Sequence, residues 1–286
     1  MKRIAISILF IALAATSYGQ FESMMGAPKS VVDQKNSQDA KSGKNVTDAK
    51  GLKQGAWEKR GVDGTLVYKA TFKDDKPVGE MVRYHANGRK KAVVVYDSLG
   101  VYGEASLYDE KESLVANGFY SGTLKDSVWS YYDPFKNIIC RESFKLGKKD
   151  GESAYLFQNG TPYEVINYKN DLKDGDWIQY YRSGKVKSMG LYKAGKNVGA
   201  FKVLFEDGSS EIVGFYRDGQ PDGIWKFYKT NGKVDYEIHY KYGKILNADE
   251  LDKRKNERVM QLEKNKNSVK DPEQYRNDPD GYMQGN

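Results

Sequence analysis

Hydrophobic and polar residues alternate in short runs along most of this chain, and the pattern repeats at a fixed period. Glycine recurs on a grid of 24 positions without an insertion, and only Ser127 interrupts the grid. An aromatic residue stands 17 positions after each grid residue, in all eight units. A period this strict predicts stacked copies of one supersecondary unit. The grid glycines are Gly55, Gly79, Gly103, Gly151, Gly175, Gly199 and Gly223, and the aromatic residues are Phe72, Tyr96, Tyr120, Phe144, Tyr168, Tyr192, Tyr216 and Tyr240.

Each unit contains two short runs rich in aromatic and β-branched residues, which favour strands. Pairs such as Asn159-Gly160 separate the runs, and they accept the positive φ that a tight hairpin turn requires. A second turn carries its own glycine in several units. The sequence therefore predicts an all-β fold over residues 53–246, an elongated array of about eight 24-residue β-hairpins stacked as one antiparallel sheet.

Large side chains occupy the second and fifth positions after the grid residues. These positions differ in parity, so in a regular strand they lie on opposite faces of the sheet. Both faces therefore carry large side chains, and the sheet shelters them by curling. We take the aromatic ones, with two tyrosines near the C-terminus, as candidate partner-binding residues. They are Trp57, Tyr84, Tyr108, Trp129, Tyr132, Trp177, Tyr180, Trp225, Tyr228, Tyr275 and Tyr282.

Two units depart from the pattern at their first turn. Glu112 and Lys136 replace the turn glycine, and residues 133–137 predict a different loop. One interpretation places a docking site there. The other is sequence drift in a tolerant surface turn.

The first residues have the features of a secretory signal. Lys2 and Arg3 supply the positive start, and the apolar run 4–15 is too short to span a bilayer. Small residues precede a cleavage point ahead of Gln20, so residues 1–19 are predicted to be a signal peptide. The alternative is a retained membrane anchor. Cleavage predicts an exported protein, either periplasmic or located at the cell surface or secreted.

Different segments flank the array. Residues 20–52 are poor in apolar groups and predict a flexible leader. Residues 247–268 predict a helix, with Asn247 as its cap and Glu250 completing a capping box. Glu250 and Arg254 are spaced for an ion pair along the helix. We expect this helix to cover the edge of the last strand, since an open edge invites aggregation; a partner-binding helix is the alternative.

The last segment, residues 269–286, is predicted to be disordered. It contains the phrase Asp-Pro-x-x-Tyr twice, ending at Tyr275 and at Tyr282. Polar tails with prolines are commonly disordered without a further role. Two tyrosines in one frame also suit a linear docking motif that orders on contact. Both interpretations stay open.

The charge excludes one class of partner. The formal net charge is +7, and loss of Lys2 and Arg3 with the signal lowers it to +5. The basic side chains are spread through the turns, whereas a nucleic-acid-binding surface concentrates them on one face or arm. We therefore expect no nucleic-acid partner. Weak attraction to acidic polymers of the cell envelope and a merely solvated surface both fit the remaining charge.

Catalytic and metal-binding patterns are not found in the sequence. Cys140 is the single cysteine, and within a strand such a thiol suits a small buried hydrophobe. His85 and His239 lie in different units without a metal-ligand grouping around them. The sequence also contains no Gly-x-Ser-x-Gly elbow and no phosphate-binding loop. We expect a non-catalytic protein without a metal or cofactor.

The repeat resembles the bacterial variant of the MORN repeat, found in proteins often labelled YwqK-type antitoxins. The resemblance rests on Trp177, Tyr180, Tyr181, Gly184, Lys185, Tyr192, Gly195, Lys196 and Gly199, and again on Gly223, Trp225, Tyr228, Gly232, Lys233, Tyr240 and Gly243. It implies an elongated stack of β-hairpins that contacts proteins or lipids without catalysis. The units are also similar to choline-binding and cell-wall-binding repeats, but the 24-residue period favours the MORN variant.

These features support two main hypotheses of function. The first is a non-catalytic scaffold that holds proteins of the cell envelope. The second is a module that binds glycan or peptidoglycan, because rows of Tyr and Trp offer flat faces for sugar rings. An antitoxin and a lipid-contacting protein rank below these, since export removes the chain from a cytoplasmic toxin and the array lacks an amphipathic basic helix.

Overall fold

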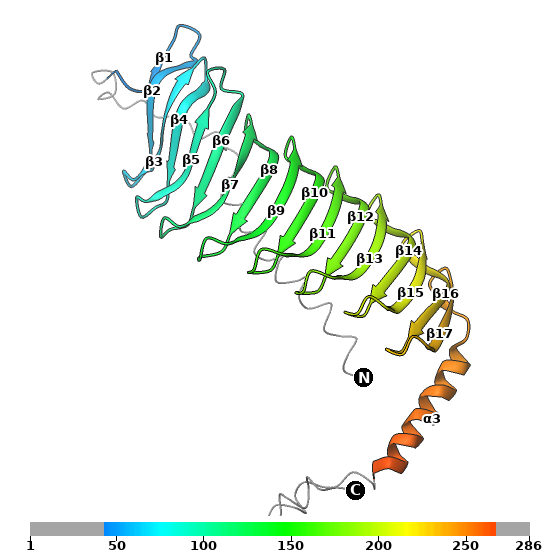
Figure 1. Cartoon of the computed structure of the whole chain (residues 1–286). Coiled ribbons are helices and arrows are strands. Elements are labelled where there is room, and N and C mark those ends of the chain that lie inside the picture. The colour runs from blue at the N-terminus through cyan, green and yellow to red at the C-terminus, as the bar shows by residue number, and fades with distance from the viewer. Residues whose placement is uncertain (1–42, 267–286) are drawn as a thin grey trace, which may run out of the picture.

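The computed structural model describes residues 43–266, with side-chain positions up to residue 261. Within this part of the chain an eighteen-stranded antiparallel sheet is followed by one helix (Figure 1). The strands are β1 (Val46–Thr47), β2 (Lys53–Arg60), β3 (Leu66–Lys73), β4 (Lys76–Tyr84), β5 (Lys90–Tyr96), β6 (Tyr102–Tyr108), β7 (Leu114–Ser121), β8 (Leu124–Tyr132), β9 (Ile138–Lys145), β10 (Lys148–Leu156), β11 (Pro162–Lys169), β12 (Leu172–Tyr180), β13 (Val186–Lys193), β14 (Lys196–Leu204), β15 (Ser210–Arg217), β16 (Gln220–Tyr228), β17 (Val234–Lys241) and β18 (Lys244–Ile245), and the helix is α3 (Ala248–Lys266). The predicted signal peptide and tail lie outside the described residues.

Every strand pairs with its sequence neighbours, so the sheet is a chain of consecutive hairpins. The strands lie side by side in chain order along one long axis, and α3 leaves the sheet at its β17 end (Figure 1). The predicted all-β hairpin array is confirmed. Eighteen strands form rather than about sixteen because the short strands β1 and β18 extend the two ends. Strand β1 lies in the stretch expected to be a flexible leader, where it pairs with β2.

The second turn of most units is a two-residue turn in which both residues have positive φ. Leu146 and Gly147 show this geometry, with φ of 48° and 84°. A turn of this kind has the twist that matches two antiparallel strands. The same conformation recurs at 74–75, 170–171, 194–195, 218–219 and 242–243. The tightest turns are therefore the second ones, rather than those that carry the Asn-Gly and Asp-Gly pairs.

The first turns are longer, and only the second residue before the next strand has positive φ. Glycine fills this position in most units, as at Gly184. Glu112 and Lys136 adopt the same conformation without being glycine, with φ of 66° and 68°. Asp109 and Asp133 support these two turns, because each carboxylate accepts two backbone N–H groups of its own turn.

The grid residues mark irregularities in the pairing. Gly175 has φ of 115°, and the register between β11 and β12 shifts across it. A bulge of this kind bends the strand. Gly103 differs, because its pairing with β5 is regular and a Cβ there would stand 2.6 Å from Cγ1 of Val94. The strict glycine period thus has two physical causes, left-handed backbone at most positions and lack of space at Gly103.

Most buried side chains lie on one face of the sheet, which we call the aromatic face. It carries positions 2, 4, 13, 15 and 17 after each grid residue, as the cross-strand pairs of Trp129 with Glu142 and of Ile166 with Trp177 show. Its central cluster comprises Ala92, Val94, Ala105, Leu107, Ala116, Tyr120, Trp129, Tyr131 and Cys140. Since no second layer of described residues covers this face, the sheet buries it by curving around it.

At both ends of the sheet, side chains form hydrogen bonds with backbone groups that have no neighbouring strand. At the first edge, Oδ1 of Asn45 accepts the Glu58 N–H at 2.8 Å. At the last edge, Oδ1 of Asn247 accepts the His239 N–H at 3.0 Å, and its amide donates to the Glu237 carbonyl. The side chain of Asn247, the residue before α3, thus covers these groups, whereas cover of this edge by the helix itself stays a prediction.

Helix α3 is fixed to the sheet by Arg254. Its guanidinium donates to the Asp235 carbonyl and forms an ion pair with the Asp235 carboxylate at 2.6 Å. It also lies over the Tyr236 ring, 5.1 Å from the centroid. The sequence predicted a pair between Arg254 and Glu250 within the helix; Arg254 turns to the strand instead, where it meets a carbonyl, a carboxylate and a ring together.

Candidate binding surfaces

The tryptophans predicted as binding residues are mostly core residues. Trp57, Trp129 and Trp225 have exposed fractions of 9%, 0% and 7%. The indole N–H of Trp129 donates to the Phe119 carbonyl at 2.9 Å, and that of Trp225 donates to the Phe215 carbonyl. These rings therefore pack the aromatic face and satisfy their polar atom on the neighbouring strand.

The fourth tryptophan belongs to a ladder of rings. Trp177 is half-buried and stacks on Phe201 with centroids 6.2 Å apart, and Phe201 stacks on Trp225 at 5.4 Å. The Trp177 N–H donates to Oε1 of Glu164 at 2.8 Å, and Gln179 donates to the same oxygen. The ladder joins three successive units on the aromatic face.

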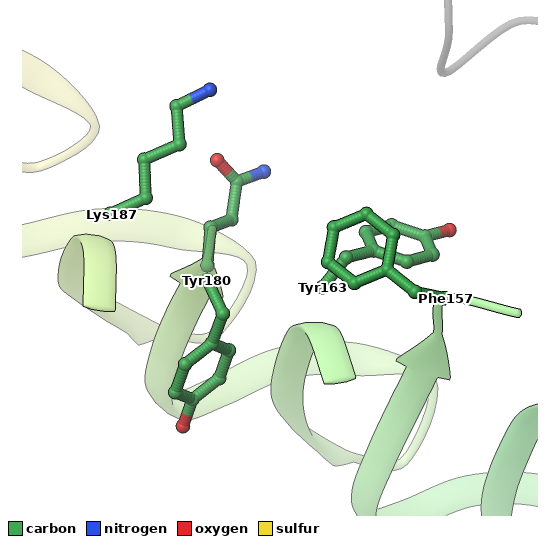
Figure 2. A pocket seen from close by; sticks show the side chains of 5 residues that line it. Phe157, Tyr163, Tyr180 and Lys187 are labelled. Carbon is green, nitrogen blue, oxygen red and sulfur yellow. The ribbon is translucent and has the colours of Figure 1, made fainter. Parts of the chain in front are cut away.

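The tyrosines at the fifth position lie on the opposite face and are half-buried. Tyr132 shows this, because its hydroxyl donates to Oδ1 of Asn117, whose Cα partner is Ser130. Figure 2 shows the Tyr180 ring on the other side of the ribbon from Lys187 and from the Phe157 and Tyr163 rings. The predicted opposition of positions 2 and 5 is confirmed. The half-buried tyrosines of this set are Tyr84, Tyr108, Tyr132, Tyr180 and Tyr228.

The predicted site residues are therefore divided by the sheet into two groups. The tryptophans lie on the aromatic face and the five tyrosines lie on the opposite face. Tyr275 and Tyr282 lie outside the described residues. A binding role for the exposed parts of the tyrosines stays a prediction.

The sequence interpretation missed two apolar patches on the opposite face. The first patch consists of Val95, Phe119 and Val128, and the second patch consists of Leu191, Phe215 and Ile224; all six side chains are exposed. In the first patch, Glu104 pairs with both Val95 and Phe119, so a carboxylate lies between two apolar side chains. Polar residues occupy the equivalent places on β9 to β12, including Ser143, Glu152, Asn167 and Asp176. The sequence signal for these patches is an apolar residue at the first or the sixteenth position after the grid residue, which occurs in some units and not in others.

A shallow hollow of about 180 Å³ lies beside the first turns of two neighbouring units. Phe157 and Tyr163 form one wall, with ring centroids 5.4 Å apart. Gln179, Tyr180 and Lys187 complete the lining. Figure 2 shows the Phe157 and Tyr163 rings packed against each other, with the Lys187 side chain across the hollow from them.

A buried ion pair lies on the aromatic face near the middle of the array. Glu142 is fully buried, and Oε1 accepts the Lys149 ammonium at 2.6 Å and the Tyr155 hydroxyl at 3.2 Å. Burial, followed by the nearby Glu142 carboxylate, raises the pKa of the Tyr131 hydroxyl above its ordinary value. The carboxylate has no surface open to a ligand, so this cluster organises the core. The sequence did contain a signal for this cluster. Glu142 is the fifteenth residue after its grid residue, a position at which the other units have Gly, Ala, Val or Ile.

The described residues offer few groups for metal or redox chemistry. Among residues 43–261, no three His, Cys, Asp or Glu side chains gather as metal ligands would. His85 is buried with Nε2 2.9 Å from the Tyr108 carbonyl, and Cys140 is buried in the central cluster. The sole described helix, α3, is too polar to cross a membrane.

The comparisons with known proteins identify the repeat. A model of the MORN repeat variant matches residues 173–194 and 221–242. A mutant form of the Photorhabdus luminescens Tc holotoxin pore aligns with 68% of this chain and 14% of its own, at 9% identity and a TM-score of 0.14, and a score this low supports no argument. No curated protein matches the chain.

The match falls on β12–β13 and β16–β17, which carry Trp177 and Trp225, the first and last rings of the aromatic ladder. MORN repeats generally mediate binding, and the family is typically non-catalytic. Both matched segments have the geometry of the other hairpins in the array. These two segments of the chain are therefore repeats of the MORN repeat variant family.

Proposed function

We propose that this protein is a non-catalytic scaffold, exported to the periplasm or the cell surface, that holds proteins of the cell envelope. The first and second apolar patches carry the proposal. Exposed apolar groups that recur beside charged residues are typical of protein contact sites. Export follows from the signal features of residues 1–19, which the same experiment tests through the identity of the partners.

Photocrosslinking in the native host tests the scaffold. A photoreactive phenylalanine analogue replaces Phe119 or Phe215 in the patches, and Phe135 serves as the matched control, because it is an exposed phenylalanine on a first turn. We expect the same envelope proteins to be captured from positions 119 and 215 and not from 135. Equal capture from all three positions, or no capture of envelope proteins, would contradict the proposal.

The tail is the second contact that we propose. Removal of residues 271–286 takes away both Asp-Pro-x-x-Tyr phrases and leaves the described array intact. If the tail is a docking motif, the truncated chain loses partners that the full chain captures, while its thermal unfolding is unchanged. Unchanged capture would leave the sheet face as the contact.

A glycan-binding module is the second candidate function, and the hollow favours it. The Phe157 and Tyr163 rings form an apolar wall, and Gln179 and Lys187 offer donors across from it, which suits a sugar ring. Replacing Tyr163 by Ala is expected to reduce binding to isolated cell wall, whereas replacing the equally aromatic but distant Phe135 is not. Equal wall binding by both variants would exclude the hollow as the site.

A further inference from the structure

Exposed basic residues occur at the second turn of five consecutive hairpins, from β9–β10 to β17–β18. They stand at the strand ends that flank each turn. Because each hairpin adds two strands, the step between turns is about 10 Å. We call these residues the basic row: Lys145, Lys148, Lys169, Lys193, Lys196, Arg217, Lys241 and Lys244.

In three of the five hairpins, two lysines of the basic row are direct cross-strand partners. Lys145 pairs with Lys148, and Lys193 pairs with Lys196. The third pair, Lys241 with Lys244, joins β17 to β18. Like charges directly opposite each other destabilise a sheet. The folding of the hairpins therefore does not account for these lysines.

The neighbouring carboxylates are used by the backbone. Asp150 accepts the Asn170 N–H at 3.3 Å, and Asp174 accepts the Ala194 N–H at 3.0 Å. Each bond fixes the tip of the next hairpin to the strand before it. The same hydrogen bond recurs in two further units, where Asp126 accepts the Leu146 N–H and Asp222 accepts the Tyr242 N–H. The turns that carry the basic row are thus held at a constant spacing.

These carboxylates neutralise only part of the row. Within residues 43–261, the ion pairs that reach the basic row are Lys193 with Asp174 at 3.5 Å and Arg217 with Asp222 at 3.0 Å. Both cations remain largely exposed. Asp171 and Asp218 lie in two of the five turns, so the positive charge along this side of the array is greatest at the other three turns, which carry the lysine pairs.

The opposite side of the array differs. There Lys185 donates to the Glu206 carbonyl, and Lys229 forms an ion pair with Asp235. Lys233 is exposed in the same turn as Lys229, and Lys136 is exposed in the first turn between β8 and β9. These four lysines match four of the basic row in charge, and they stand apart from it across the width of the strands. They provide a control of equal net charge.

We propose that the basic row binds a linear acidic polysaccharide, whose carboxylates contact successive hairpins. A straight row on an elongated array suits an extended polymer better than a compact anion. Duplex DNA carries about one charge per 1.7 Å, far denser than the row. Single-stranded nucleic acid uses aromatic platforms for its bases, whereas among the five turns of the row only the turn 242–243 carries an aromatic residue, Tyr242.

The proposal is independent of protein docking, because the apolar patches and the basic row share no residue. It is tested by the affinity of the full chain for immobilised polygalacturonate, with neutral dextran, phosphatidylglycerol vesicles and single-stranded DNA as comparisons. One variant combines Lys145→Gln, Lys148→Gln, Lys193→Gln and Lys196→Gln. The control variant combines Lys136→Gln, Lys185→Gln, Lys229→Gln and Lys233→Gln.

We expect the row variant to bind polygalacturonate about tenfold or more weakly than the unmodified chain, and the control variant to stay within about twofold. Thermal unfolding checks the fold, and the row variant is expected to be at least as stable because charge repulsion is relieved. Equal losses in the two variants, or unchanged binding by the row variant, would overturn the proposal. Tighter binding to the vesicles or to DNA than to polygalacturonate would overturn it as well.

Discussion

The indole ring of Trp129 on β8 lies against Gly118 on β7, in the space that a side chain at position 118 would fill. A Cβ built on Gly118 would stand 2.4 Å from Cδ2 and 2.5 Å from Cγ of the ring. Gly214 and Trp225 repeat the relationship four units further along the chain, with 2.3 Å to Cδ2. A small residue on one strand is thus the condition for a buried tryptophan on the next.

This contact predicts the effect of adding one carbon. Gly118→Ala is expected to lower the free energy of unfolding by about 1–3 kcal/mol, because the ring is fully buried and the core must shift. Gly190→Ala is the control, since a Cβ there meets Phe201 at 3.4 Å, an ordinary contact. Urea unfolding of the two variants measures the difference; equal losses would show that the ring moves freely.

The buried ion pair makes a second prediction. Lys149→Met leaves the buried Glu142 carboxylate without its ammonium partner and is expected to cost about 3–5 kcal/mol in the free energy of unfolding. The double variant Glu142→Leu with Lys149→Met removes the charge as well and is expected to recover most of that loss. Chemical denaturation of the single and double variants checks this, and a double variant as unstable as the single one would contradict it.

The irregular first turns make a third prediction. Lys136 adopts a left-handed conformation that costs a non-glycine residue about 1 kcal/mol. Lys136→Gly is therefore expected to raise the free energy of unfolding by up to about 1 kcal/mol, less the greater freedom of glycine in the unfolded chain. The reverse change at a standard turn, Gly184→Ala, is expected to lower it. Thermal unfolding measures both, and a loss on Lys136→Gly would show that other contacts hold this turn.

The contact between helix and sheet is expected to depend on pH. Partial burial acts to raise the pKa of Asp235, but hydrogen bonds from Arg254 and Lys229 outweigh it and leave the pKa below its ordinary value. A lowered pKa in the folded state means that the contact is fully present above the unfolded value of about 4 and is lost as pH falls through the folded value. NMR signals of Arg254 and Tyr236, followed below pH 5, measure the loss.

Asp235→Asn is the control for this titration. It removes the ionisation while keeping a side chain of similar size, so the Arg254 signals are expected to lack the acid transition. A transition of unchanged midpoint in this variant would assign it to a different carboxylate.

The array could be predicted from the sequence because its causes are local. Glycines at turns and bulges, aromatic residues at fixed positions and the alternation of strands all act within one unit or between neighbours. The opposite placement of Trp177 and Tyr180 followed from parity alone. Asn247 directly precedes α3, as predicted, but its side-chain oxygen accepts the His239 N–H of β17 rather than an N–H of the helix.

The candidate site was harder to predict, because burial depends on how far the sheet curves. Trp129 suggested a binding residue, yet curvature and Gly118 bury its ring completely. The exposed Phe119 and Phe215 were overlooked, since a period-2 pattern does not tell which face is sheltered when both carry large side chains. Glu142 was missed for a related reason, as its partner Lys149 is brought to it by a bulge.

The asparagines at the two edges determine what a change in repeat number can do. Asn45 and Asn247 each occupy backbone groups to which a further strand would otherwise bond. A 24-residue unit gained or lost between them therefore changes the length of the molecule by one hairpin without opening a new edge. The length of the sheet can therefore change only in steps of one whole repeat, while both of its ends keep the same side-chain contacts.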